Sequence, residues 1–242
     1  MRNFLILFLL NFFDFFHKKK ILSFLKKKGF SNFKIFFDIG AHKGETINLF
    51  IKNFKIENIY SFEASPINFE DLKKTKTLLK KFINTSIILE NYAVGESEKK
   101  IKIKHLVESS SSTLKELNTE SKYYKKKFKF LNKKVKGGYY HNIEVNMITL
   151  KNYIEKKKIE NIDLIKIDTE GYEFEVLLGL KEKLKNVKLI LFEHHYDDMI
   201  KKNYNFGNLH NVLVLNNFSQ IFKIKMPFRK SFEYIYKNNL IN

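Results

Sequence analysis

The sequence predicts a doubly wound α/β domain built on a mostly parallel β-sheet. Short apolar runs of strand length alternate with stretches of helical spacing over most of the chain. The first of these runs leads into a glycine-containing turn and a helix-like stretch. Polar and acidic residues come directly after several predicted strands, as expected where the carboxyl ends of parallel strands border a ligand crevice. With 242 residues, 44% of them hydrophobic, the chain is long enough for one sizeable domain with its own core.

The N-terminal segment, residues 1–30, is hydrophobic at first and then basic. Phe4–Phe16 is apolar except for two polar residues, and lysine runs follow at 18–20 and 26–28. At 13 residues the apolar run is too short to span a bilayer as a helix, and no signal peptide is expected because no small-residue cleavage site follows it. Two interpretations stay open: a helix that covers an edge of the core, or a Phe-rich anchor in a membrane interface with the lysines on anionic headgroups.

The first strand and its turn lie in Ile35–Thr46, which reads IFFDIGAHKGET. Gly40 allows the backbone to turn tightly and approach a ligand, and Gly44 allows the helix over Thr46–Lys52 to start close to the strand with free N–H groups. The spacing from Asp38 is D-x-G-x-x-x-G and differs from the G-x-G-x-x-G of dinucleotide enzymes, so the ligand need not carry a pyrophosphate.

An acidic residue ends the second predicted strand. Asn58–Phe62 is followed by Glu63, 25 residues beyond Asp38. A carboxylate at this place can accept hydrogen bonds from both hydroxyls of a ribose. Together with the glycine turn, it predicts a nucleoside-containing ligand.

The middle of the chain continues the alternation and then departs from it. We expect a helix over Phe69–Phe82 and a short strand over Ile87–Leu89. Lys99–Lys104 and His141–Ile148 alternate apolar and polar residues and read as half-buried strands. The polar, lysine-rich stretch 108–138 between them has no clear pattern, and a loop of this length in a compact domain is usually either functional or a solvated excursion.

The last third returns to regular alternation. Thr149 is a suitable N-cap for the first helix of this part. The predicted elements in order are a helix over Thr149–Lys157, a strand over Ile162–Ile167, a helix over Tyr172–Leu184, a strand over Val187–Phe192, a helix over Leu209–Leu215 and strands over Ser219–Ile224 and Phe232–Tyr236.

Five of these stretches, taken together, resemble a known family. They are FFDIGAHKGET, YSFEASP, NYAVGE (Asn91–Glu96), IDLIKIDTEGYEFEVLLGL (Ile162–Leu180) and LILFEHH (Leu189–His195). In order and spacing, over roughly residues 35–195, the chain resembles the FkbM family of S-adenosylmethionine-dependent methyltransferases. The resemblance implies a seven-stranded, Rossmann-like class I methyltransferase sheet over residues 31–242 with an inserted β-hairpin or loop, and a last strand slotted between its neighbours.

The resemblance also implies site residues. The cofactor-binding residues would be Asp38, Gly40, Ala41, Gly44, Glu63, Ser65, Asn91, Ala93 and Asp168. Among them, Asn91 would read the edge of the adenine base. The catalytic candidates are Asp168, Glu170, Lys166, Glu193 and His194, with His195 as the alternative to His194. Methyl transfer needs alignment of the acceptor and removal of its proton, which a carboxylate or histidine can perform.

The charge of the chain suggests its partners. Lysine and arginine exceed the acidic residues by 19, which favours anionic partners, although lysine enrichment is also typical of an A/T-rich genome. Nucleic acid is not expected, because only Arg2 and Arg229 are arginines and arginine is the usual base-reading side chain. The resemblance implies O-methylation, with a sugar hydroxyl, a surface-glycan precursor or another small polar metabolite as the acceptor. The expected location is the cytoplasm, with the inner membrane face and peripheral contact of residues 1–28 with anionic lipid as an open extension.

Three other functions are weaker. Asp168, Glu193, His194 and His195 could supply ligands for Mg²⁺ or Mn²⁺, but they lack tight spacing, so no metal is predicted. The spacing after Asp38 disfavours an NAD-dependent oxidoreductase. A degenerate cofactor-binding module in polysaccharide assembly is the remaining alternative. The absence of cysteine excludes disulfides, thiolate metal sites and a cysteine nucleophile.

Overall fold

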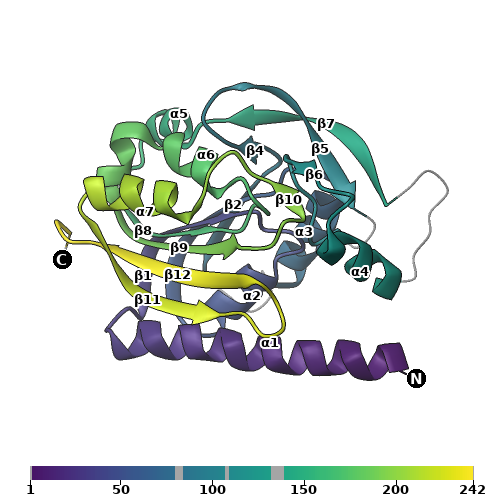
Figure 1. The fold of residues 1–242 in the computed structure, drawn as a ribbon. Helices are drawn as coiled ribbons and strands as arrows, with labels where there is room; N and C mark the ends of the chain where they lie inside the picture. The colour runs from purple at the N-terminus through teal and green to yellow at the C-terminus, as the bar shows by residue number, and fades with distance from the viewer. Residues whose placement is uncertain (1, 80–83, 107–108, 132–138, 242) are drawn as a thin grey trace.

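A computed structural model describes residues 2–79, 84–106, 109–131 and 139–241. Its centre is a seven-stranded sheet in the order β11-β12-β9-β8-β1-β2-β3 (Figure 1). The strands are β1 (Asn32–Ile39), β2 (Lys55–Phe62), β3 (Ser86–Glu90), β8 (Ile162–Ile167), β9 (Val187–His195), β11 (Phe218–Lys225) and β12 (Ser231–Asn238). The predicted α/β class is confirmed.

The direction of the strands follows the prediction. β3, β2, β1, β8 and β9 pair in parallel, while β12 runs antiparallel to both β9 and β11 and lies between them. The central strands are buried on both faces, as β8 (IDLIKI) illustrates with every residue but Asp163 buried. Two-sided burial is the reason that these strands read as nearly continuous apolar runs in the sequence.

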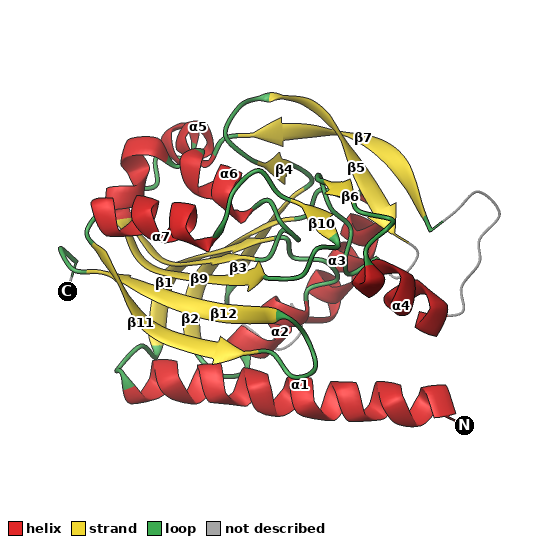
Figure 2. Ribbon diagram, in the orientation of Figure 1, coloured by secondary structure: helices red, strands yellow, loops and turns green. Residues whose placement is uncertain are grey.

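Helices cover both faces of the sheet (Figure 2). The helices are α1 (Arg2–Lys27), α2 (Glu45–Ile51), α3 (Pro66–Leu79), α4 (Lys122–Leu131), α5 (Leu150–Lys156), α6 (Glu173–Leu178) and α7 (Phe206–Leu215), with a 3₁₀ helix η1 at Lys181–Asn186. Apolar residues of α1, α2 and α3 pack on one face of the sheet. Those of α5, α6, η1 and α7 pack on the other. Thr149 caps α5 as predicted, because its side chain accepts a hydrogen bond from the N–H of Asn152 at 3.3 Å.

The prediction of one helix over Tyr172–Leu184 is wrong. α6 ends at Leu178 with Gly179 as its C-cap, and the chain continues as η1 from Lys181, whose φ is 49°. Gly179 packs directly on the backbone at Gly95, since a Cβ at Gly179 would lie 2.0 Å from that carbonyl oxygen. This tertiary contact, together with the left-handed residue, divides the helix.

The insertion is more ordered than the sequence indicated. β5 (Lys99–Leu106) and β7 (Tyr140–Ile148) form the expected antiparallel pair, which β4 (Ala93–Val94) extends to three strands. Within 108–138, β6 (Glu116–Leu117) pairs with β10 (Ile200–Lys201), and α4 packs buried aromatic rings beside it. The expectation of an unpatterned stretch is therefore wrong for the described part. Residues 107–108 and 132–138 of this stretch lie outside the described residues.

The N-terminal segment forms a single long helix, α1. Its second half packs into the core through Ile21, Leu22 and Leu25, while Phe15 and Phe16 stay exposed. Of the side chains that the structure describes on this helix, those that pack into the core follow the apolar run. Across the described part of the chain, none of the helices has the length and apolar character needed to cross a membrane.

Candidate active site

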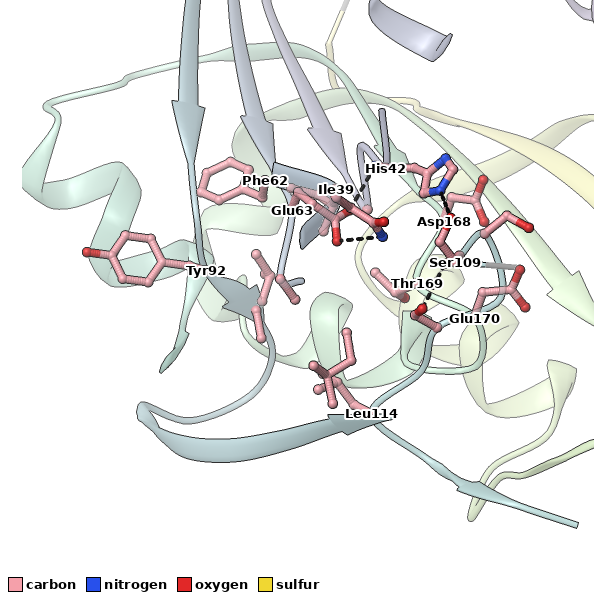
Figure 3. A pocket seen from close by; sticks show the side chains of 18 residues that line it. Ile39, His42, Phe62, Glu63, Tyr92, Ser109, Leu114, Asp168, Thr169 and Glu170 are labelled. Atoms are coloured by element: carbon pink, nitrogen blue, oxygen red, sulfur yellow. Dashed lines mark hydrogen bonds between the residues drawn. The ribbon is translucent and has the colours of Figure 1, made fainter. Parts of the chain in front are cut away.

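The carboxyl ends of β1, β2 and β8 meet at one edge of the sheet and border an open pocket (Figure 3). The pocket encloses about 540 Å³ of space, part of it open to solvent. Its lining residues are Ile39, Gly40, His42, Phe62, Glu63, Ala64, Asn68, Tyr92, Ala93, Val94, Ile103, Ser109, Ser110, Ser112, Leu114, Asp168, Thr169 and Glu170. Five predicted site residues are among them: Gly40, Glu63, Ala93, Asp168 and Glu170.

Glu63 is a fixed carboxylate on the pocket wall. Its oxygens accept hydrogen bonds from the backbone N–H groups of His42 and Ser65, both at 2.8 Å, and from the Asn68 amide at 3.4 Å. Burial raises the pKa of Glu63 to about 7, although these donors oppose the rise. The carboxylate is therefore held in one orientation before any ligand binds.

The two glycines of the turn make close packing contacts. Gly40 has φ 81°, and a Cβ there would lie 1.9 Å from the backbone oxygen of Asp168. Gly44 has φ 90° and begins α2, where a Cβ would lie 2.9 Å from the Thr75 methyl group of α3. The expectation that Gly44 brings the helix close to the strand needs correction, because the close neighbour is another helix. Gly40 likewise brings β1 against the end of β8.

Behind the pocket, Lys166 joins two carboxylates. Its Nζ lies 2.9 Å from Asp168 Oδ2 and 3.9 Å from Oδ1 of Asp38, which is fully buried. Burial would raise the pKa of Asp168, but the Lys166 ammonium outweighs it and holds that pKa below the usual range. Asp38 has no comparable hydrogen bond among the described residues, and burial raises its pKa to about 6. Lys166 thus keeps Asp168 ionised at the pocket wall.

A second charged group stands at the ends of β8 and β9. Nε2 of His195 lies 3.3 Å from a carboxylate oxygen of both Glu170 and Glu193, and its Nδ1 lies 3.5 Å from Asp197. Burial works to lower the pKa of His195, yet the surrounding carboxylates raise it to about 10. Burial raises the pKa of Glu193 to about 8 and also raises that of Glu170. Glu170 lines the pocket, whereas His195 and Glu193 do not.

His194 does not join this group. It is buried against the rings of Tyr196, Tyr204 and Phe206, and burial lowers its pKa to about 3. Successive residues of a strand point to opposite faces, so on β9 His195 shares a face with Glu193 whereas His194 faces the α7 side. The structure therefore separates His194 from the other catalytic candidates and brings His195 to them.

Three predicted cofactor residues support the pocket from behind. The Asn91 amide nitrogen donates to the backbone oxygens of Glu63 at 2.7 Å and Ala64 at 3.2 Å, so both of its hydrogens are used within the protein. Any contact of Asn91 with a base edge would therefore have to come from its side-chain oxygen. Ser65 is fully buried and its hydroxyl contacts His105 at 2.9 Å. Ala41 is buried and its N–H donates to the Phe62 oxygen.

The sequence reasoning missed residues that close the pocket. His42 donates its N–H to Glu63, and its Nε2 lies 2.8 Å from the Ser109 hydroxyl of the insertion (Figure 3). The Thr113 hydroxyl of the same segment donates a hydrogen bond to the backbone carbonyl oxygen of Glu170 at 2.7 Å. The segment therefore bridges the loops after β1 and β8. Tyr92 adds an aromatic ring; its position between Asn91 and Ala93 was the available signal.

No group of three or more histidine and acidic side chains within the described ranges is arranged to hold a metal ion. The cluster around His195 is therefore best described as an ion-pair network. Its charges can position a proton-bearing substrate group or hold a proton themselves.

The comparisons with known proteins decide the family. The model of the methyltransferase FkbM domain matches residues 38–221, most of the chain. The chain belongs to this family. The match covers the pocket-forming ends of β1, β2 and β8 together with the insertion. No curated protein matches the chain in sequence.

Several solved structures share the architecture of this chain. Methyltransferase FkbM from Methylobacillus flagellatus shares 14% identity at a TM-score of 0.55, with 84% of this chain and 43% of that one covered. The chain thus spans less than half of that protein's length. Magnesium protoporphyrin IX methyltransferase from Synechocystis, solved with bound SAH, shares 7% identity at a TM-score of 0.53, covering 95% and 85%. A Streptococcus agalactiae protein of the NADB-Rossmann superfamily shares 11% identity at a TM-score of 0.51, covering 93% and 68%. These likenesses support the Rossmann-like methyltransferase fold.

Proposed function

We propose that the protein transfers a methyl group from S-adenosylmethionine to a hydroxyl of a sugar, a surface-glycan precursor or another small polar metabolite. The observation that carries the proposal is Glu63, a carboxylate locked by the N–H groups of His42 and Ser65 on the wall of a pocket at the carboxyl edge of the sheet. The family match gives the reaction class. We assign the transferase domain to residues 31–242 and treat residues 1–30 as an appended helical segment.

The residues present fit this cofactor. A nucleoside needs an acceptor for its ribose hydroxyls and apolar walls for its base. Glu63 supplies the acceptor, and Phe62, Tyr92 and Val94 supply apolar and aromatic wall. Asp38, two residues before Gly40, has two buried carboxylate oxygens without a hydrogen-bond partner among the described residues, whereas buried polar groups normally have one. Asp38, Gly40, Ala41, Gly44, Ser65, Asn91 and Ala93 then act mainly by shaping the loops around the ligand.

S-adenosylmethionine, when bound, supplies an electrophilic methyl group on a sulfonium. The protein's task is to align the acceptor oxygen and to remove its proton as the new bond forms. Asp168 is our first choice for the reaction centre, since Lys166 keeps it ionised on the pocket wall and a carboxylate there can accept a hydrogen bond from the acceptor hydroxyl.

Glu170 is the residue that we assign to take the proton. It lines the pocket, and burial raises its pKa, which makes it a stronger base than an exposed carboxylate. His195 and Glu193 stand behind it and set its charge, with His195 Nε2 3.3 Å from Glu170. In this proposal His195 takes the place of His194 as the relevant histidine.

The net charge of +19 suits an acceptor that carries phosphate or carboxylate groups. We place the reaction in the cytoplasm, with residues 1–28 in peripheral contact with the inner face of an anionic membrane. Modification of a polysaccharide precursor fits this place.

The test is calorimetric titration of the whole chain with S-adenosylmethionine and, in parallel, with NAD. We expect micromolar S-adenosylmethionine binding, no comparable NAD binding, and strong weakening in Glu63→Gln. Acceptors are then screened for release of S-adenosylhomocysteine with sugar nucleotides and glycan fragments. A folded protein that binds no S-adenosylmethionine would contradict the proposal; Glu57→Gln, at an exposed glutamate of β2, is the control.

A further inference from the structure

Two segments far apart in the sequence form one aromatic surface at the edge of the molecule. Phe13 of α1 meets Phe228, at the tip of the β11–β12 hairpin, with ring centroids 5.1 Å apart. Phe16 lies about one helical turn beyond Phe13, and its ring centroid is 5.5 Å from that of Phe15, which points further around the exposed side of the helix. The exposed fractions of Phe15, Phe16 and Phe228 are 56%, 44% and 71%. We call these four residues the aromatic edge.

Such exposure is unusual, because large aromatic side chains normally bury most of their surface. The polar residues beside these rings are also tied into the structure. Asp14 lies 3.4 Å from the Arg229 guanidinium, and His17 lies 2.5 Å from Glu233. These two contacts fix the hairpin against the helix, so the rings are held together on a rigid support.

Lysines surround the aromatic edge. Lys18, Lys19 and Lys20 follow it on α1 and are exposed, and Lys230 stands beside Phe228 on the hairpin. The Lys19 ammonium lies 5.6 Å from the centre of the Phe15 ring. Residues 15–28 contain six lysines and no acidic residue. The nearby acids, Asp14 and Glu233, already face cationic or histidine partners.

The helix α1 is apolar toward its N-terminal end and basic toward its C-terminal end. Its apolar sequence, Phe4–Phe16, precedes the basic one, and Figure 1 shows α1 running below β11 and β12 with its N-terminal end beyond the hairpin tip. Thirteen helical residues extend about 20 Å, too little to cross the roughly 30 Å hydrocarbon core of a bilayer. Aromatic rings and lysines of this arrangement suit the boundary between acyl chains and headgroups.

We propose that the aromatic edge and its lysines bind the surface of an anionic phospholipid bilayer, with the hairpin tip and α1 as one docking unit. Charge complementarity selects this occupant, since the flanking cations match phospholipid headgroups whereas a second copy of this basic surface would be repelled. The inference extends the membrane contact in the proposed function to the β11–β12 hairpin, and it does not depend on methyl transfer.

Docking would bring the candidate active site toward the membrane. Arg229, at the hairpin tip, is electrostatically coupled to Glu193 and Glu170, and Lys18 lines a small cavity together with Lys166 and Glu233. The membrane-facing unit and the acidic end of β9 are therefore adjacent. An acceptor carried in the bilayer would reach this edge by lateral diffusion.

The experiment is co-sedimentation of the full chain with vesicles of phosphatidylcholine alone or with added phosphatidylglycerol. We expect strong binding to the anionic vesicles and much weaker binding to phosphatidylcholine alone. About 0.5 M salt should reduce binding to the anionic vesicles toward that lower level, because screening removes the charge contribution and leaves the apolar one. The double variant Phe15→Ser/Phe16→Ser should bind at least tenfold more weakly. Lys19→Glu/Lys20→Glu should weaken binding to the anionic vesicles and remove most of its salt dependence.

Matched variants control for the loss of exposed apolar surface and of charge. Leu215→Ser/Leu240→Ser removes two residues that are 82% and 71% exposed, and Lys99→Glu/Lys102→Glu reverses two exposed lysines of β5; both should bind like the parent. Circular dichroism and S-adenosylmethionine titration of every variant separate unfolding and loss of the cofactor site from loss of lipid binding.

Two results would overturn the proposal. The first is parent protein that ignores anionic vesicles, or a Phe15→Ser/Phe16→Ser variant that binds them as the parent does. The second is a parent protein that is a dimer by light scattering and does not bind vesicles, together with a Phe15→Ser/Phe16→Ser variant that is a monomer. That outcome would assign the aromatic edge to self-association.

Discussion

The two halves of the candidate site are built by different means. The half at β1 and β2 is made of backbone: Glu63 is held by the N–H groups of His42 and Ser65, and Gly40 lets two strand ends touch. The half at β8 and β9 is made of charged side chains: Lys166 pairs with Asp168 at 2.9 Å, and His195 lies 3.3 Å from both Glu170 and Glu193.

The two halves should therefore respond differently to substitution. The half that is held by backbone contacts depends on backbone conformation, and a substitution disrupts it when the new side chain cannot fit. A buried charge network depends on balance, because each charge is costly without its partner and shifts the pKa of its neighbours. We expect substitutions in the first half to act through folding and cofactor affinity, and those in the second half through stability of the charged state and rate.

The largest effect is expected from Lys166→Met. Removal of the ammonium leaves the buried carboxylates of Asp38 and Asp168 facing each other, which should lower the free energy of unfolding by about 3–5 kcal/mol at neutral pH. Urea unfolding measures it. Lys104→Met is the control, because its partner Glu116 is exposed, and it should cost less than about 1 kcal/mol. Adding Asp38→Asn to Lys166→Met should recover part of the loss; no recovery would contradict the pairing.

Gly40→Ala tests the backbone half. The new Cβ would meet the Asp168 oxygen at 1.9 Å in a residue whose φ is 81°, so we expect a loss of about 3 kcal/mol in unfolding free energy. Gly29→Ala is a close control, since Gly29 has φ 83° and a Cβ there would have no neighbour within 4 Å. It should cost only the conformational strain of about 1 kcal/mol. Equal losses in the two variants would rule out the strand contact.

His195→Gln and His194→Gln compare adjacent residues that face opposite ways. Loss of the imidazole between Glu170 and Glu193 should lower kcat by about 100-fold once an acceptor is known, because the proton-accepting carboxylate loses its partner. His194→Gln should leave kcat within about threefold and act mainly on stability, since His194 packs among aromatic rings. The opposite ranking would restore His194 as the catalytic histidine.

Cofactor affinity should depend on pH through Glu63. Burial raises its pKa to about 7, so the carboxylate is ionised above that pH and protonated below it. Only the ionised form can accept hydrogen bonds from two ribose hydroxyls, and affinity should fall about tenfold between pH 8 and pH 6. Titrations at several pH values measure the slope. Glu63→Gln should bind weakly with no such slope, and a parent without the slope would show that Glu63 does not titrate in this range.

Ser109→Ala should have the smallest effect. It removes the hydrogen bond between the insertion and His42 Nε2, worth about 1 kcal/mol, and should weaken S-adenosylmethionine binding about fivefold. Ser110→Ala is the control, because Ser110 lines the same pocket but makes no side-chain hydrogen bond to the described parts of the chain. Identical affinities for both variants would mean that the insertion does not help to close the pocket.

The sequence by itself determined the class of fold and the half of the candidate site at β1 and β2. Strands buried on both faces are continuous apolar runs, and a glycine turn followed by an acidic strand end has a fixed spacing along the chain. These features are local, because they depend on residues near one another in sequence. Gly40, Glu63 and Asp168 were placed at one edge for this reason.

Only the tertiary structure decided the charged half and the surface beside it. The predicted strand ended at Phe192, and without its extension to His195 the alternation of faces that separates His194 from His195 could not be applied. The contact of Gly40 with Asp168, the bridge from Ser109 to His42 and the meeting of Phe13 with Phe228 join residues that are 67 to 215 positions apart. Such contacts arise from packing of distant segments, which no local pattern of residue types records.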